Sequence, residues 1–503
     1  IQPGERAPDV ARLIDNLMLQ EIEVHVADEN FTATDVHNYD GEFAYSKEFP
    51  KGSYIIRLDQ PRKHLIQTLF EREAIIDEEF LKEERERKAS KRSSQIYDIT
   101  SWSIPLAQGI EAYWTNRFTD VSLTRLQSVP KASPLPAGGK GGGKQPAVAY
   151  LLSYTSNAAA KCLGLLLQKD YRVHVACEEF QLNGRHFNRG TLVIKVGENK
   201  ADLHEQIVKF TASEGVAFVP TDTGWTEAGI KFGSREVVYL KRPKIAVLYD
   251  VPASSLSYGW IAYLFEQRYG LEFSAIRSDI LTDGNLSDYN VIIFPNGSAD
   301  KYRTDLGEEG VKRLKTWVQN GGTLVLIKGA AVFGTHDNVK FTTSQQIHDL
   351  RKLNPDAAKE KPHTSEAQGE GKAPAVPDEP IPEEYKPDEV HGAVVKVKLD
   401  RYHFLSYGYG EEINVLLDSD YLFTPSKEGH NAATFVDSPQ LRVSGLLSEK
   451  MTKALPKQAY LIDEPTGRGH VILFADEPNF RATWDGLTRL FLNSIFFGPS
   501  LRR

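Results

Sequence analysis

Three short apolar runs between Lys244 and Gly329 constrain the fold more than any other part of the chain. They cover residues 245–249, 291–294 and 323–327. Unbroken runs rich in β-branched residues are typical of strands that are buried on both faces, as in parallel sheets. Residues 311–318, between the second and third runs, have the spacing of an amphipathic helix that glycines then stop. Strand, helix and strand in this order predict a right-handed βαβ unit of an α/β fold.

Polar residues follow each of the three predicted strands. Asp250 comes after the first, Asn296 after the second and Lys328 after the third. Open α/β sheets bind ligands in a crevice at the carboxyl ends of their strands. We therefore predict a ligand-binding crevice lined by Asp250, Asn296 and Lys328. None of these tips carries an evident nucleophile, base or metal cluster, so no catalytic and no metal-binding residue is assigned.

The length and composition exclude several classes of protein. A chain of 503 residues is too long for one core and predicts about three domains. Its net charge of -8 argues against nucleic acid as a partner, because such proteins need a basic surface. No apolar run approaches the length of a membrane span. Cys162 and Cys177 are the only cysteines, which leaves neither a disulfide framework nor a cysteine zinc site.

A repeat links the first two parts of the chain. Residues 24–31 resemble residues 173–180, and residues 49–58 resemble residues 187–196, in the same order. A predicted helix follows in each copy, at 63–70 and at 203–210, and a further helix is predicted at the end of the chain, at 484–496. Two matched blocks in one order indicate a true duplication.

The second copy opens with a predicted strand at 147–152, before a helix at 157–167. The equivalent strand of the first copy would fall on or before Ile1. We therefore expect that the first copy lacks its opening strand and that the chain is the C-terminal part of a longer polypeptide.

Together these patterns predict an α/β protein with two small α/β repeats followed by a doubly wound, flavodoxin-like domain. The expected parts are repeat copy 1 at 1–130, a Gly/Pro/Lys linker at 131–146, repeat copy 2 at 147–242, and the doubly wound domain at 243–503 with a disordered insertion at 354–387.

Two motifs with catalytic or metal-binding spacing have simpler explanations. The glycine- and lysine-rich run 138–144 is close to a phosphate-binding loop, but Gln145 replaces its Ser/Thr and Pro146 prevents a helix from starting there. His363 and Glu366 have the spacing of a zinc-binding pair, but they lie in the predicted insertion, without a rigid surrounding shell. We interpret the first as a linker and the second as a chance match.

The doubly wound part resembles the class I glutamine amidotransferases and the similar trehalose-utilisation-type domains. In active amidotransferases a cysteine stands on a sharp turn after the strand that corresponds to residues 323–327. Here that turn continues as Gly329-Ala330-Ala331, without a thiol, and the late strand that ends at 476–481 lacks the partner histidine and glutamate of the family. The resemblance implies an amidotransferase-like domain without amidotransferase activity.

A second resemblance covers nearly all of the chain outside the predicted linker and insertion. The phrases at 51–58, 97–109, 320–325 and 476–481 resemble the C-terminal region of large bacterial zinc carboxypeptidases of the carboxypeptidase A type. The zinc ligands and the general base of that family cannot be placed in this sequence. The resemblance therefore implies a non-catalytic region whose partner is a zinc-binding peptidase domain of the same polypeptide, in a periplasmic or extracellular setting.

Three hypotheses of function follow. The first is an accessory region that packs on the peptidase domain, shapes access to it, or binds peptide or glycan. The second is a stand-alone binding protein that uses the strand-tip crevice. The third is an unrecognised hydrolase or amidotransferase with a non-cysteine nucleophile, for which Ser298 is the first candidate and the sequence supplies no base.

Overall fold

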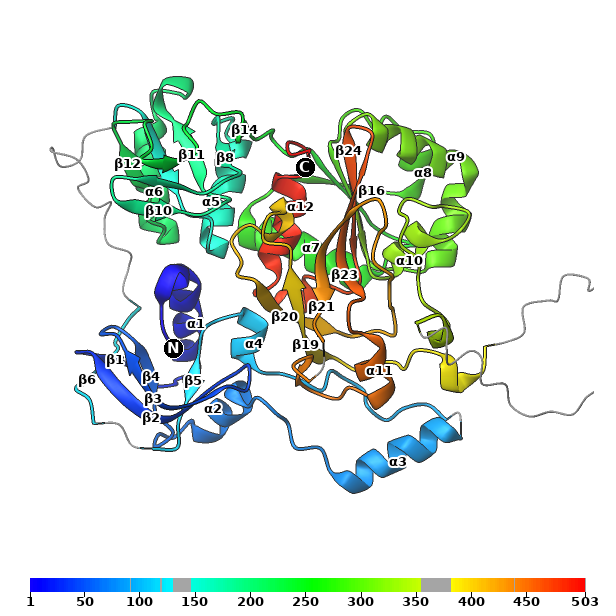
Figure 1. Cartoon of the computed structure of the whole chain (residues 1–503), viewed down its shortest axis with the longest axis horizontal. Coiled ribbons are helices and arrows are strands. Elements are labelled where there is room, and N and C mark those ends of the chain that lie inside the picture. Colours follow the sequence, from blue (N-terminus) through cyan, green and yellow to red (C-terminus); the bar gives the residue numbers. More distant parts are fainter. Residues whose placement is uncertain (91, 118–119, 130–145, 354–380, 438, 503) are drawn as a thin grey trace, which may run out of the picture.

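The computed structural model describes residues 1–90, 92–117, 120–129, 146–353, 381–437 and 439–502 (Figure 1). The fold class is α/β, as predicted. Most of the predicted linker and insertion lie outside the described residues, as do both the glycine-rich run 138–144 and the pair His363 and Glu366.

The first part of the chain forms two three-stranded sheets, ordered β4-β1-β6 and β3-β2-β5. Its helix α1 places Val10, Leu13 and Leu17 on one buried face, as the helical spacing requires. The elements are α1 (Ala7–Leu19), β1 (Val24–Ala27), β2 (Phe31–Asn38), β3 (Phe43–Phe49), β4 (Tyr54–Ile56), α2 (Lys63–Phe70), α3 (Glu78–Ala89), α4 (Ile104–Gln108), β5 (Tyr113–Trp114) and β6 (Leu123–Arg125).

The second part forms a five-stranded sheet, ordered β12-β7-β11-β8-β14, and a three-stranded sheet, ordered β10-β9-β13. The elements are β7 (Ala149–Leu152), α5 (Asn157–Gln168), β8 (His174–Ala176), β9 (Phe180–Leu182), β10 (Arg185–Phe187), β11 (Leu192–Lys195), α6 (Leu203–Glu214), β12 (Val219–Thr221), β13 (Ala228–Gly229) and β14 (Val237–Tyr239).

The two parts repeat the same strand pairing in the same register. His25 lies opposite Ile55 in the first part, and its sequence equivalent His174 lies opposite Val193 in the second. The matched phenylalanines also stack alike, with ring centroids 5.1 Å apart for Phe31 and Phe49 and 4.9 Å apart for their equivalents in the second part. The structure thus contains two copies of one α/β repeat.

The copies differ beside β4. In the second copy, Leu192 of β11 lies opposite Leu152 of β7. In the first copy Tyr54, the equivalent of Leu192, exchanges two backbone hydrogen bonds of 2.9 Å with Ile1. Ile1 therefore holds the position that the last residue of β7 holds in the second copy.

The third part is built on a ten-stranded mixed sheet. Its strands β16-β15-β17-β18-β24 are parallel, and β23, β21, β19 and β20 extend it in antiparallel pairs. The tenth strand, β22, also pairs with β19 in antiparallel orientation. Strands β15, β17, β18 and β24 are buried along their length, which explains their continuous apolar sequences, whereas the edge strand β16 is largely exposed.

This part carries helices on both sides of its sheet. Figure 1 shows α7 and α12 on one side and α8 and α9 on the other, the arrangement of a doubly wound fold. The elements are β15 (Ile245–Leu248), α7 (Ser255–Tyr263), β16 (Phe273–Ile276), α8 (Ser278–Thr282), β17 (Val291–Phe294), α9 (Ala299–Gln319), β18 (Thr323–Ile327), α10 (Gly329–Thr335), β19 (Ala393–Leu399), β20 (Glu412–Leu417), β21 (His430–Phe435), β22 (Arg442–Ser444), α11 (Glu449–Ala454), β23 (Ala459–Thr466), β24 (Gly469–Phe474) and α12 (Thr488–Phe496).

Buried polar contacts join the three parts. The carboxylate of Asp9 in α1 accepts the backbone N–H of Asn157 at 3.1 Å and lies 3.5 Å from the guanidinium of Arg489 in α12. Asp485, just before α12, pairs with Arg268 at 2.8 Å and with Arg12 of α1. Separating the two parts would leave buried charges without their partners, which costs free energy. These contacts therefore hold the first copy against the third part.

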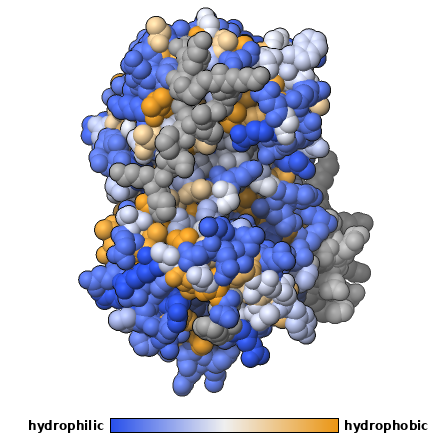
Figure 2. Space-filling model, turned by 90° about the vertical axis from the view of Figure 1, so that its left-hand side faces the viewer, coloured by the Kyte–Doolittle hydropathy of each residue, from blue (hydrophilic) through white to orange (hydrophobic). Residues whose placement is uncertain are grey.

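The face in Figure 2 is mainly hydrophilic, with apolar patches on its lower half, at the height of the first copy in Figure 1. The β3-β2-β5 sheet of the first copy carries the exposed aromatic side chains Phe43, Tyr45 and Trp114. Among the helices described, none is both long and apolar enough to cross a bilayer.

Candidate ligand-binding cavity

A cavity of about 740 Å³ opens at the carboxyl ends of the parallel strands. Asn296 and Lys328 contribute to it from the strand tips, and Ser254, Ser257 and Trp260 contribute from α7 and the residue before it. The remaining lining residues are Ser94, Ile96, Tyr97, Asp98, Ile99, Leu256, Glu389, His391, Asp418, Glu477, Phe480 and Arg481. A concave site with apolar walls and a few convergent polar groups is the usual form of a small-molecule site.

Lys328 occupies the sharp turn between β18 and α10. Its backbone has φ 52° and ψ -109°, a conformation that residues with a Cβ seldom adopt. The next residue must be glycine, because a Cβ on Gly329 would lie 2.0 Å from the carbonyl oxygen of Gly297. A strained strand-to-helix turn of this kind exposes one side chain above a sheet, and in hydrolases that side chain is the nucleophile.

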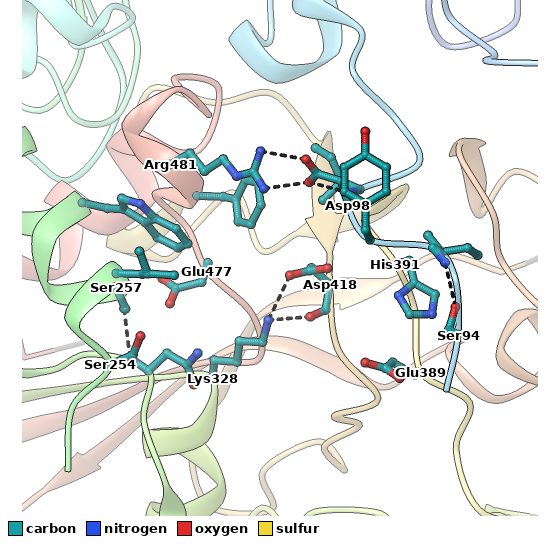
Figure 3. A pocket seen from close by; sticks show the side chains of 17 residues that line it. Ser94, Asp98, Ser254, Ser257, Lys328, Glu389, His391, Asp418, Glu477 and Arg481 are labelled. Atoms are coloured by element: carbon teal, nitrogen blue, oxygen red, sulfur yellow. Dashed lines mark hydrogen bonds and ion pairs between the residues drawn. The ribbon is translucent and has the colours of Figure 1, made fainter. Parts of the chain in front are cut away.

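Two carboxylates hold the side chain of Lys328. Its Nζ lies 3.2 Å from Asp476 Oδ1. It also lies 3.4 Å from Asp418 Oδ2, a contact that is drawn in Figure 3. Burial alone would lower the pKa of Lys328, but Asp476 and Asp418 outweigh it and raise the pKa above its usual value. The amine therefore stays protonated, and a protonated amine is not a nucleophile.

Asp476 is itself tightly held. Its carboxylate accepts hydrogen bonds from the backbone N–H of Asp418 at 2.7 Å, the hydroxyl of Ser419 at 2.9 Å and the backbone N–H of Glu477 at 2.8 Å. Asp476 is only 1% exposed. Lys328 and Asp476 thus form a buried ion pair with its remaining hydrogen bonds satisfied, which positions the ammonium group at the base of the cavity.

Glu477 is the deepest acidic group of the lining. It is 3% exposed, and its Oε1 has no hydrogen-bond partner among the described residues. Burial raises the pKa of Glu477 to about 7, although a hydrogen bond from Ser257 and the charge of Lys328 oppose the rise. A buried carboxyl group with an unused oxygen in a cavity is a marker of a functional site.

A segment of the first repeat copy covers one side of the cavity. We call residues 94–99 the strap. Asp98 of the strap pairs with Arg481 of the third part through contacts of 2.7 and 3.3 Å, and the two side chains face each other in Figure 3. Just beyond the strap, Thr100 donates its backbone N–H to His391 at 2.8 Å. The cavity therefore depends on two parts of the chain.

Two of the three residues that were predicted to line the crevice do line the cavity. Asn296 and Lys328 both line the cavity, and the Asn296 side chain accepts the N–H of Gly329 at 3.0 Å. Asp250 does not line it, because φ 63° at this residue turns the chain and its exposed carboxylate pairs with Arg277 at 2.7 Å. Ser298 also lies outside the lining, where its hydroxyl caps α9 by accepting the N–H of Lys301 at 3.4 Å.

Sequence reasoning missed most of the charged lining. Glu477 lines the cavity, and its neighbour Asp476 pairs with Lys328. Both come shortly after β24, whose apolar run predicts a strand, so the rule used for the first three tips also applied to them. Asp418 follows β20 in the antiparallel extension, where that rule gives no guidance. Asp98 and Arg481 have no sequence signal for their pairing across the chain.

No metal site emerges from the parts of the chain that the structure describes. These residues contain no group of three or more histidine, cysteine, aspartate or glutamate side chains that could hold a metal ion. The cavity can thus offer a ligand hydrogen bonds, carboxylate charge and aromatic surface from the residues themselves.

We expect the stability of the protein to depend on the ionisation of Glu477. The pKa in the folded state, about 7, exceeds the ordinary value of 4.5, so this group favours folding most below pH 4.5 and loses that contribution as pH rises to 7. Glu477→Gln, which cannot ionise, should gain up to roughly 3 kcal/mol relative to the wild type between pH 4.5 and 8. Urea unfolding at both pH values measures this, and the exposed Glu428→Gln should show no such gain. Equal pH profiles for wild type and Glu477→Gln would contradict this ionisation.

Solved structures of other proteins align with about half of this chain. No family model matches the sequence, and no curated protein matches it either. A ThuA-like protein from Bacteroides uniformis aligns over 50% of this chain and 89% of its own, with 13% identity and a TM-score of 0.31. A ThuA-like protein from Parabacteroides merdae aligns over 51% and 90%, with 13% identity and a TM-score of 0.33. A glutamine amidotransferase from Thermotoga maritima aligns over 50% and 97%, with 9% identity and a TM-score of 0.30.

Proposed function

We propose that this chain is the non-catalytic, ligand-binding region of a zinc metallocarboxypeptidase. The observation that carries the proposal is Lys328, which stands on the strained turn between β18 and α10 with its charge matched by Asp476 and Asp418. A protonated, paired lysine in this position cannot attack a ligand as a nucleophile. The cavity around it is large enough for a small polar molecule.

In this proposal, the region packs on a peptidase domain elsewhere in the same polypeptide and acts in the periplasm or outside the cell. Zinc belongs to that peptidase domain, and a peptide or glycan near it supplies the ligand. The sequence phrases shared with large bacterial zinc carboxypeptidases support this setting.

The cavity also supports a second function, that of a stand-alone binding protein. The observation in its favour is that residues of the first copy and residues of the third part together line the cavity. Such a protein would bind its ligand equally well without a peptidase domain, whereas an accessory region would change the substrate range or rate of one.

Ligand binding can be tested by blocking the cavity. Ser254 lines it and is half-buried, so Ser254→Trp should fill it with little other change. Ser213→Trp, on the exposed face of α6, is the matched control. Saturation-transfer NMR with sets of amines, polyols and small acids should show at least one set binding to wild type and control but not to Ser254→Trp. Absence of binding by all sets, or binding that Ser254→Trp leaves unchanged, would contradict the proposal.

The non-catalytic part of the proposal has a separate test. Purified protein incubated with Zn²⁺ should release no C-terminal residues from peptides, because the described residues hold no metal-ligand group and Lys328 is not a nucleophile. Mass spectrometry of the peptides measures this. Zinc-dependent removal of C-terminal residues that survives repeated purification would contradict it.

A further inference from the structure

Charges in the cavity are unequal, and the excess is negative. Two cations, Lys328 and Arg481, and the imidazole of His391 line the cavity together with four carboxylates: Asp98, Glu389, Asp418 and Glu477. Asp476 adds a fifth carboxylate as a partner of Lys328. Each cation is already neutralised, since Lys328 pairs with Asp418 and Asp476, and Arg481 pairs with Asp98. A further anion would meet no free positive partner among these groups.

Glu477 and Glu389 are the acidic groups left without an ion pair within the described lining. Glu477 is the more informative of the two, because it is only 3% exposed. Its Oε1 also has no hydrogen-bond partner among the described residues. Figure 3 shows Glu477 on the inner side of the cavity, between Ser257 and Lys328. A buried polar atom without a partner is costly, so a hydrogen-bond donor from a ligand would stabilise it.

Aromatic side chains line the same cavity. Trp260 and Phe480 both line the cavity, with ring centroids 5.2 Å apart, and the guanidinium of Arg481 already lies 5.0 Å from the Phe480 ring. Aromatic faces attract cations, most strongly where water is excluded. Carboxylates together with an indole ring form a combination that selects an organic cation over a neutral polyol.

We infer that the cavity binds a primary alkylammonium group, which donates hydrogen bonds to Glu477 and lies near Trp260. This inference rests on the proposed ligand-binding function and names the chemistry of the ligand. The ammonium keeps its proton, and Glu477, where protonated, releases its own proton to solvent as the ion pair forms. A free amine and the side chain of a lysine in a peptide share this chemistry.

Isothermal titration calorimetry tests the inference with three probes. Cadaverine represents free amines, Nα-acetyl-lysine N-methylamide represents peptide lysine, and 1,5-pentanediol is the uncharged counterpart. At least one of the two ammonium probes should bind wild type, and roughly tenfold more tightly at pH 8 than at pH 6, because Glu477 loses its proton between these values. Which of them binds identifies the source of the ammonium group.

Variants locate the contact. Glu477→Gln should weaken ammonium binding about tenfold or more and remove its pH dependence, because a charge-assisted hydrogen bond becomes a neutral one. Ser254→Trp should abolish binding and Ser213→Trp should not. Binding of the ammonium probes that is unaffected by Glu477→Gln would overturn the inference.

These measurements distinguish a failure of the ammonium inference from a failure of the proposed ligand-binding function. If the diol or another neutral probe binds wild type but not Ser254→Trp, and neither ammonium probe binds, the cavity is a ligand site and the inference of an ammonium ligand is wrong. If no probe of any class binds, both the inference and the proposed ligand-binding function are wrong.

Discussion

Replacing Asp463 with asparagine should lower the free energy of unfolding by about 3–5 kcal/mol near neutral pH. Asp463 is fully buried and accepts hydrogen bonds from His403 Nε2 at 3.1 Å and from His470 Nδ1 at 2.9 Å. The other nitrogen of His470 lies 2.7 Å from the carbonyl oxygen of Leu501, which can only accept, so both ring nitrogens of His470 carry protons. Asparagine would leave this imidazolium buried without its counter-ion.

The same cluster predicts how stability changes with pH. Burial raises the pKa of Asp463, but the hydrogen bonds from His403 and His470 outweigh it and lower the pKa to about 2. Its contribution is therefore present above the ordinary value of 3.8 and lost as pH falls toward 2. Asp463 raises the pKa of His470 despite burial, so that contribution is lost as pH rises through a value above 6.5.

Urea unfolding of wild type and variant measures the effect of Asp463→Asn. Asp300→Asn is a suitable control, because Asp300 also pairs with a basic residue, Arg303, but its side chain is 84% exposed. An exposed pair contributes less than about 1 kcal/mol, so this variant should unfold like the wild type. Equal losses in the two variants would mean that the buried cluster does not carry the charges assigned to it.

The second large effect concerns Lys328. Lys328→Met should also lower the free energy of unfolding by about 3–5 kcal/mol, because it leaves Asp476 buried without a cation. The double variant Lys328→Met with Asp476→Asn should recover much of the loss, since it removes the uncompensated charge as well. An isosteric apolar side chain at 328 keeps the shape of the turn.

Chemical unfolding of the single and double variants forms a double-mutant cycle that measures the coupling of the two residues. Lys312→Met is the control, because Lys312 lies 3.9 Å from Glu309 in an exposed pair on α9. Additive losses in the cycle would show that Lys328 and Asp476 are not an ion pair, and the argument that Lys328 is held in its charged form would fail.

Local sequence patterns predicted the elements of the fold well. The helix expected at 63–70 is α2, and the apolar runs at 291–294 and 323–327 are the buried parallel strands β17 and β18. These predictions succeeded because helical spacing and continuous apolar runs are set by neighbours in the sequence. The predicted helix at the C-terminus begins later than Trp484, at Thr488.

The cavity depends on contacts that no local pattern encodes. Lys328 was placed at a strand tip, yet the sequence did not reveal that it would take the strained conformation of the turn, since lysine has no preference for it. The strap reaches the cavity across the interface between the first copy and the third part, and the pairing of Asp98 with Arg481 follows from that tertiary arrangement alone. Asp250 was expected in the crevice because of its position after β15, but the direction of the chain there decides otherwise.

A crystal structure of the protein grown with cadaverine tests the central claim most directly, namely that the strand-tip cavity is a ligand site with Glu477 as its recognition group. The account predicts one ammonium nitrogen within hydrogen-bond distance of the Glu477 carboxylate and the alkyl chain against Trp260, with Lys328 still paired to Asp476. A cavity that holds only water at saturating cadaverine, or cadaverine bound elsewhere on the protein, would contradict it.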